Sequence, residues 1–165
     1  MRADAIPPYE QELRSFLAPL GVDLDAQAVC FQVYRTSTDV IAAFEARALR
    51  PLGLSHTGFA LMMTIQVGGP QEVRTLARKH RLSRPSVTSA IGTLERARLV
   101  ERERSTDDKR LVSVTLTAQG RRVVRKALDA LHRCEREFTA GLTKGEQRQL
   151  AASLRRVGEA ARNGR

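Results

Sequence analysis

The chain has 165 residues, of which 42% are hydrophobic, and its 28 Lys and Arg against 18 Asp and Glu give a formal net charge of +10. This length suits one domain, or one domain with extensions, and leaves no room for a separate catalytic domain. The charge favours a polyanionic partner, and the scarcity of aromatic residues argues against single-strand recognition by base stacking, so duplex DNA is the better match.

Membrane insertion, metal binding and catalysis find little support in the sequence. No apolar run is long enough to span a bilayer, and the amino terminus lacks the hydrophobic stretch of a signal peptide, which predicts a cytoplasmic protein. The three histidines and two cysteines form no HxxxH or CxxC pair. The common phosphate-binding loops and the nucleophile elbow are missing as well. We therefore expect no metal, no cofactor and no enzymatic activity.

Two helices are predicted in the first third of the chain. A short amphipathic helix with Leu13 and Phe16 on its apolar face should end before Gly21. A long helix should then run from Asp25 to about Leu49, where the following proline and glycine end it.

The next segment predicts a buried helix. Ser55 is a natural N-cap, and the residues through Gln66 are apolar nearly all round, which is typical of a helix with no solvent-facing side. Gly68-Gly69-Pro70 then breaks the chain.

Residues 73–96 contain two short helical patterns that meet at a tight turn. Leu76 and Ala77 give the first helix a small buried face. Ser83 is a natural N-cap for the second helix, and Pro85 falls in its first turn, where a missing backbone N–H costs little. The buried face of the second helix consists of Val87, Ile91 and Leu94.

The opposite face of this second helix is small, hydroxyl-rich and basic, and it contains no carboxylate. A major groove accepts such a surface, because small side chains allow close approach while hydroxyls and Arg bond base edges or phosphates. The alternative is an ordinary solvated helix face. The candidate DNA-binding residues here are Arg84, Pro85, Ser86, Thr88, Ser89 and Arg96.

Residues 100–116 predict a β-hairpin. The alternation of apolar and polar residues from Val112 to Leu116 is typical of a half-buried strand, and Val100–Arg104 can form its antiparallel partner. The turn between them, Ser105 to Asp108, is rich in residues that bond the local backbone. Arg104, Lys109 and Arg110 are candidate DNA contacts, and Asp108 can hold the arginine in position by a charge-assisted bond. The alternative is a hairpin tip whose charges only keep it soluble.

Two amphipathic helices close the chain. Thr117 is expected to cap a long helix that carries Val124, Leu128, Leu131 and Phe138 toward a partner. Thr143 and Glu146 have the form of a capping box. They precede a helix with apolar residues at Leu150, Leu154 and Val157.

The run from Leu82 to Gly120 resembles the core of the MarR family of bacterial transcriptional regulators. The resemblance rests on the Asp-x-Arg of the hairpin, Asp108 to Arg110, and on the closing L-T-x-x-G that begins at Leu116. More loosely it extends over residues 25–160. One departure is Arg98, because the family often has glycine there; a left-handed backbone at this position would strain the arginine.

This resemblance implies a mainly α fold with a small β-wing. A winged helix-turn-helix at 55–117 would lie between dimerisation helices at 1–54 and 118–165. It also implies a homodimer that binds a pseudopalindromic operator and represses transcription until a small molecule or an oxidant releases it.

A small organic ligand is the first trigger that the resemblance implies, often anionic and aromatic in this family. Apolar walls and one or two cationic groups could receive its carboxylate. The candidate lining residues are Phe44, Arg47, His56, Phe59 and Met63, although Met and Phe at such spacing are also common in plain cores.

Oxidation of Cys30 is the second trigger. The segment from Cys30 to Tyr34 is similar to the one around the reactive cysteine of the organic-peroxide-sensing branch, where tyrosines hold the thiolate. Tyr34 matches one family tyrosine, but Phe44 and His56 stand where the two thiolate-bonding tyrosines would be. Activation of the thiol would then fall to His56 or to the helix environment. The alternative is a small buried hydrophobic cysteine.

A second class of function fits the same residues, namely a winged-helix module that docks proteins or structured RNA instead of duplex DNA. Sequence-selective duplex binding above a steeply salt-dependent background would separate the two classes.

Overall fold

The computed structural model describes residues 7–104 and 112–164. The described residues form helices and a small three-stranded sheet, which confirms the predicted fold class. Contacts divide the chain into two compact units, one ending at Ala43 and one beginning at Phe44. The sequence-based division at residues 54 and 117 separates dimerisation helices from the DNA-binding part. These contacts do not test such a division by function, so it stays a prediction.

The first unit joins α1 (Pro8–Leu17) and η1 (Ala18–Leu20) to the greater part of α2 (Leu24–Phe44). The predicted stop at Gly21 is confirmed, because this residue has a left-handed backbone with φ of 70°. Glu10 is buried, and its carboxylate accepts a 2.7 Å hydrogen bond from the Gln32 side chain. Phe16, by contrast, is 69% exposed, whereas Leu13 is half-buried, so the predicted apolar face of α1 is only partly covered.

The long second helix changes its winding before it ends. After Phe44 the chain continues as a π-helical segment, η2 (Glu45–Leu49), and a 3₁₀ turn, η3 (Arg50–Leu52), with Gly53 left-handed at φ of 71°. The predicted helix to Leu49 is therefore confirmed in extent but not in form. A π segment adds a residue to one turn. Here the neighbours Ala48 and Leu49 are both buried.

Helix α3 (His56–Gly68) begins where the sequence predicts and has two caps. The Ser55 hydroxyl accepts a 3.0 Å hydrogen bond from the Gly58 N–H. The Glu45 carboxylate, from η2, accepts a 2.7 Å bond from the His56 N–H. Orphan donors at the first turn are thus satisfied, and a negative charge lies at the positive end of the helix.

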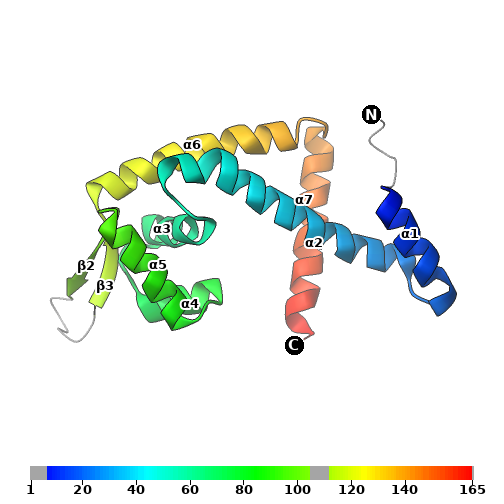
Figure 1. Cartoon of the computed structure of the whole chain (residues 1–165), viewed down its shortest axis with the longest axis horizontal. Helices are drawn as coiled ribbons and strands as arrows, with labels where there is room; N and C mark the ends of the chain where they lie inside the picture. The colour runs from blue at the N-terminus through cyan, green and yellow to red at the C-terminus, as the bar shows by residue number, and fades with distance from the viewer. Residues whose placement is uncertain (1–6, 105–111, 165) are drawn as a thin grey trace. The chain divides into compact units, whose positions relative to one another are not determined.

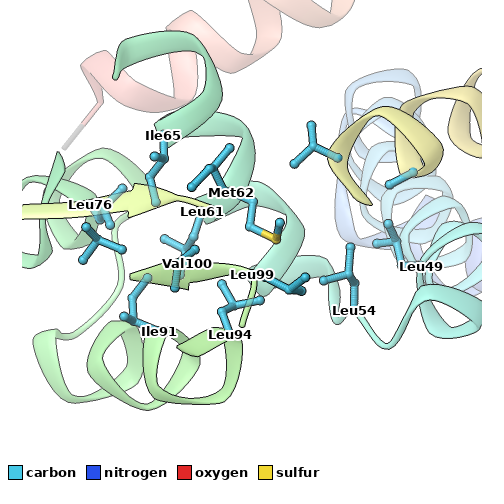
Figure 2. Packing of buried hydrophobic residues seen from close by; sticks show 14 of the residues in the cluster. Leu49, Leu54, Leu61, Met62, Ile65, Leu76, Ile91, Leu94, Leu99 and Val100 are labelled. Atoms are coloured by element: carbon cyan, nitrogen blue, oxygen red, sulfur yellow. The ribbon is translucent and has the colours of Figure 1, made fainter. Parts of the chain in front are cut away.

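The core of the second unit forms where α3 meets α4 (Val73–His80), α5 (Arg84–Arg96) and the sheet. Figure 2 shows Leu61, Ile91 and Val100 converging there from α3, α5 and a strand. Each of the three is at most 2% exposed. Burying a large apolar side chain stabilises the folded state by about 1.5–3 kcal/mol. The buried face of α5 is therefore firmly anchored in the core.

The helix-turn-helix follows the predicted local chemistry. Ser83 caps α5, since its hydroxyl accepts the Ser86 N–H at 3.2 Å. The turn between α4 and α5 contains Arg81 in a left-handed conformation with φ of 53°, which the sequence analysis did not anticipate. The anticipated left-handed residue, Arg98, has φ of 57°.

The wing rests on the predicted hairpin of β2 (Val100–Arg104) and β3 (Val112–Leu116), in antiparallel register with Val100 opposite Leu116. A two-residue strand, β1 (Gln71–Glu72), pairs with the other edge of β3 and gives the strand order β1-β3-β2. The sequence analysis missed β1.

Helix α6 (Ala118–Phe138) leads away from β3, and α7 (Lys144–Asn163) follows (Figure 1). The Thr117 cap and the capping box before α7 are both confirmed. One expectation for α6 is wrong. Val124 and Leu131 do not face a partner, because they are 1% and 7% exposed within their own chain's core, whereas Leu128 and Phe138 remain about 40% exposed.

None of the helices in the described part of the chain is both long and apolar enough to cross a membrane.

Candidate functional site

The outer face of α5 is the first candidate site. Its buried side is fixed by Val87, Ile91 and Leu94, which are at most 4% exposed. Thr88 and Ser89 are exposed, and neither hydroxyl takes part in a hydrogen bond among the described residues. The predicted candidates Arg84, Pro85, Ser86 and Arg96 are exposed too. The structure therefore brings all six predicted residues of α5 to the surface with free polar groups among them.

The single acidic residue of α5 does not share this face. Glu95 forms a 3.0 Å ion pair with Arg102 of β2. The pair turns the carboxylate toward the sheet and also ties the wing to the end of α5. At the same end, Arg96 donates a 3.0 Å hydrogen bond to the Thr93 hydroxyl. An approaching polyanion thus meets hydroxyls and guanidinium groups on α5 and no carboxylate.

A second basic surface, which the sequence analysis missed, adjoins the turn before α5. We call it the arginine hollow. It has a volume of about 590 Å³ and is lined by residues that include four arginines: Arg74, Arg78, Arg81 and Arg84. Arg74 is held by an ion pair with Glu72. The spacing of Arg74 and Arg78, one helical turn apart on α4, was the available signal.

A further hollow, here called the α3–α6 hollow, lies away from the α5 face and has a volume of about 500 Å³. Three of the predicted ligand-pocket residues line it, namely Phe44, His56 and Phe59. The sequence analysis missed the contribution of α6 and of the η2 end. These additional lining residues are Leu49, Leu128, Asp129, Leu131, His132 and Glu135.

The two other predicted pocket residues lie elsewhere. Arg47 does not line the hollow, because it pairs with Glu137 and its guanidinium lies 5.5 Å from the Phe138 ring centroid. The hydrogen bond and charge of Glu137 raise the pKa of Arg47 above its usual value. Met63 lines a separate shallow depression beside Val67. Sequence reasoning could not find the pairing of Arg47 with Glu137, because the two residues lie far apart in the chain.

Comparison with known proteins decides the family. The MarR family model matches residues 54–112. A curated HTH-type transcriptional regulator of Bacillus subtilis, YwaE, is 30% identical over 139 residues, which cover 84% of this chain and 81% of that protein. The chain belongs to the MarR family. It is a winged-helix transcriptional regulator and not an enzyme.

Solved MarR-type structures agree with this fold. The Mycobacterium tuberculosis regulator MOSR, crystallised with DNA, is 26% identical with a TM-score of 0.65, covering 82% of this chain and 97% of that one. The Streptomyces coelicolor regulator PcaV, crystallised with its natural ligand, has a TM-score of 0.71 at 23% identity, covering 86% and 98%.

The remaining DNA-contact candidates, and the predicted wing-stabilising Asp108, belong to the sequence at the end of β2 and between β2 and β3. Asp108, Lys109, Arg110 and the side chain of Arg104 lie outside the described residues. Strands β2 and β3 pair as predicted. The roles assigned to these four residues stay predictions.

The two cysteines of this MarR-family chain differ in environment. Cys30, on α2, is exposed, and Cys134, on α6, is buried. The alternative that Cys30 is a small buried hydrophobic residue is therefore wrong within this chain. Tyr34, four residues further along α2, is 72% exposed. Reactivity of Cys30 stays a prediction. Among the described residues, no cluster of three or more His, Cys, Asp or Glu is arranged to hold a metal ion.

Proposed function

We propose that this MarR-family regulator binds a pseudopalindromic operator as a homodimer in the cytoplasm and represses transcription until a small organic molecule releases it. The observation that carries the proposal is the exposed, carboxylate-free face of α5 on a helix anchored by buried residues. A rigid support matters because groove recognition requires side chains held in fixed positions.

Charge and similarity support duplex DNA as the partner. A dimer would carry twice the formal charge of +10, which favours association with the phosphate backbone. The arginine hollow beside α5 offers guanidinium groups for phosphates, while Thr88 and Ser89 are placed for base edges. MOSR, a related regulator, has been crystallised with DNA.

Uncovered apolar side chains support the homodimer. Leu150 and Leu154 on α7 are 49% and 45% exposed, and Phe16 on α1 is 69% exposed. Large exposed apolar residues on helices outside the winged helix-turn-helix are typical of a subunit interface. A twofold axis would then set two α5 helices about one DNA turn, roughly 34–36 Å, apart.

The α3–α6 hollow supports ligand control. Its volume of about 500 Å³ falls within the range of roughly 300–1,000 Å³ that is usual for small-molecule sites. Its walls come from α3, which packs against α5, and from α6, which continues β3 of the wing. A ligand that binds one arrangement of these walls better than another would shift the population of DNA-binding conformers. PcaV has been solved with its natural ligand.

Selection of bound duplexes from a random pool, followed by fluorescence anisotropy on the winning sequence, tests the proposal. We expect one pseudopalindromic sequence to bind at least about a thousandfold tighter than a scrambled duplex, with affinity that falls steeply as salt rises. Salt-dependent binding without sequence preference would instead indicate a winged-helix docking module.

A further inference from the structure

The charges around the α3–α6 hollow are opposite to those that an anionic ligand requires. Four titratable side chains line it: the carboxylates of Asp129 and Glu135 and the imidazoles of His56 and His132. With both imidazoles neutral these groups sum to −2, and with both protonated they sum to zero. As long as both carboxylates are ionised, the lining is therefore not net positive.

Two cationic features near the hollow that could receive a carboxylate are already occupied. Arg47 is committed to Glu137 on α6. The first turn of α3, whose amide groups form a natural anion site, already has the Glu45 carboxylate on its His56 N–H. The Ser55 hydroxyl takes a further N–H of that turn. A carboxylate ligand entering here would meet negative charge at the helix end.

Asp129, by contrast, is a free negative group on the wall. It is exposed, and among the described residues it has no hydrogen bond or ion pair. Glu135 and His132 are partners of one another at 3.2 Å. A ligand cation at Asp129 would therefore gain a partner without breaking an existing one.

The rest of the lining suits an aromatic or aliphatic body. Phe44 at the end of α2 and Phe59 on α3 belong to the lining, and Leu128 and Leu131 come from α6. Phe44 also stacks on Phe138, with ring centroids 5.6 Å apart, which holds its ring in place. Aromatic faces attract organic cations in addition to burying apolar surface.

From this arrangement we propose that the α3–α6 hollow selects a cationic aromatic molecule, such as an aryl amine salt or amidine, over an anionic one, with Asp129 as the specificity residue. The inference rests on the proposed ligand control and names its ligand class. It reverses the anionic ligand that the family resemblance implies.

Two planar probes of similar size and opposite charge test it, benzamidinium and benzoate. Each is titrated calorimetrically into the full chain without DNA, near neutral pH and at low salt. We expect benzamidinium to bind at least about fivefold tighter than benzoate. The reason is that Asp129 attracts the cation and repels the anion, and exposed charge pairs contribute differences of this size. Added salt should shrink the ratio.

Variants assign the preference to one residue. Asp129→Asn should reduce the ratio to near one, and Asp129→Lys should favour benzoate. Glu159→Gln, which removes an exposed carboxylate from α7, is the matched control and should keep the ratio. Circular dichroism confirms that all variants are folded.

The outcomes separate this inference from the proposed function. Benzoate binding as tightly as benzamidinium, or an unchanged ratio in Asp129→Asn, overturns the ligand class while operator binding stands. Binding of neither probe by a chain that still binds its operator also overturns it. Loss of operator selectivity in the duplex selection contradicts the proposed function, whatever the probes do.

Discussion

The Leu99 carbonyl oxygen lies so close to Gly120 that a β-carbon built on Gly120 would stand 1.9 Å from it. This contact packs the first turn of α6 directly against the backbone that follows α5. The same junction is closed by Thr117, whose N–H donates to the Leu99 carbonyl at 3.1 Å and whose hydroxyl donates to the Arg98 carbonyl at 2.7 Å.

Gly120→Ala should therefore destabilise the fold, because backbone on both sides has to move to admit one methyl group. We expect the free energy of unfolding in urea to fall by at least about 2 kcal/mol. Gly145→Ala is the control, since its methyl group would meet only the Thr143 hydroxyl at an ordinary 3.8 Å. Equal stability of the two variants would show that the Leu99 contact is not rigid.

Arg98→Gly should stabilise the protein. Arg98 is exposed and has a left-handed backbone, which costs a residue with a β-carbon roughly 1–2 kcal/mol, partly offset by the greater unfolded-state entropy of glycine. We expect a gain of about 0.5–1 kcal/mol in urea unfolding. Arg98→Ala removes the same charge but keeps the β-carbon, so a gain in that variant too would trace the effect to charge.

DNA recognition should divide between α5 and the arginine hollow. Ser89→Ala should weaken operator binding by about 1 kcal/mol or more and relax base preference, because its hydroxyl is free for a base edge. Arg78→Ala should weaken binding to all duplexes alike and reduce the slope of log affinity against log salt by about 1. Anisotropy titrations over several salt concentrations measure both effects. The assignment fails if the two variants behave alike.

Oxidation offers a separate trigger that a single substitution can test. If Cys30 senses organic hydroperoxides, its thiolate attacks the terminal peroxide oxygen and the O–O bond breaks. This leaves a sulfenic acid on the protein and an alkoxide, which takes a proton from water to become an alcohol. Cys30→Ser should then bind the operator as tightly as the parent but no longer be released by cumene hydroperoxide, whereas Cys134→Ala should still respond. A parent protein that stays on DNA in peroxide contradicts the idea.

Acid should weaken the start of α7. Hydrogen bonds from the Thr143 hydroxyl and N–H hold the pKa of Glu146 below its usual value. A carboxylate whose pKa is lower in the folded state than in the unfolded state stabilises the fold at pH values above its unfolded-state pKa. This stabilisation is lost as the pH falls through the folded-state pKa. Urea unfolding followed by circular dichroism should therefore show parent and Glu146→Gln converging in stability at acidic pH. A stability difference between the two proteins that stays constant as pH falls would contradict this role of Glu146.

Local chemistry made much of the fold predictable. Ser83, Thr117 and Thr143 were identified as caps because hydroxyl side chains before an apolar helical pattern have few other roles, and each accepts the expected N–H. Strand β1 was missed because two residues show no periodicity. The π segment before Arg50 was missed because its apolar residues also fit an ordinary helix.

The candidate sites were predictable where one helix defines them. The outward residues of α5 follow from its buried face alone, so Thr88 and Ser89 were placed correctly. Only three of the nine described residues that line the α3–α6 hollow were predicted, because the surroundings of residues such as Asp129 and Arg47 are set by chain segments far away in sequence. Arg47 and its partner Glu137 are 90 residues apart, a pairing that no local pattern encodes.

The short strand β1 has a mechanical consequence. Because Gln71 pairs with Val114, the segment that leads into α4 belongs to the same sheet as the two strands of the wing. The ion pair between Glu95 and Arg102 joins the end of α5 to strand β2 of that sheet. Helix α5 and the base of the wing are therefore held together as one rigid body. If, as proposed, a homodimer leaves DNA when it binds an inducer, we expect a change in the distance or tilt between its two rigid bodies, with each rigid body staying intact.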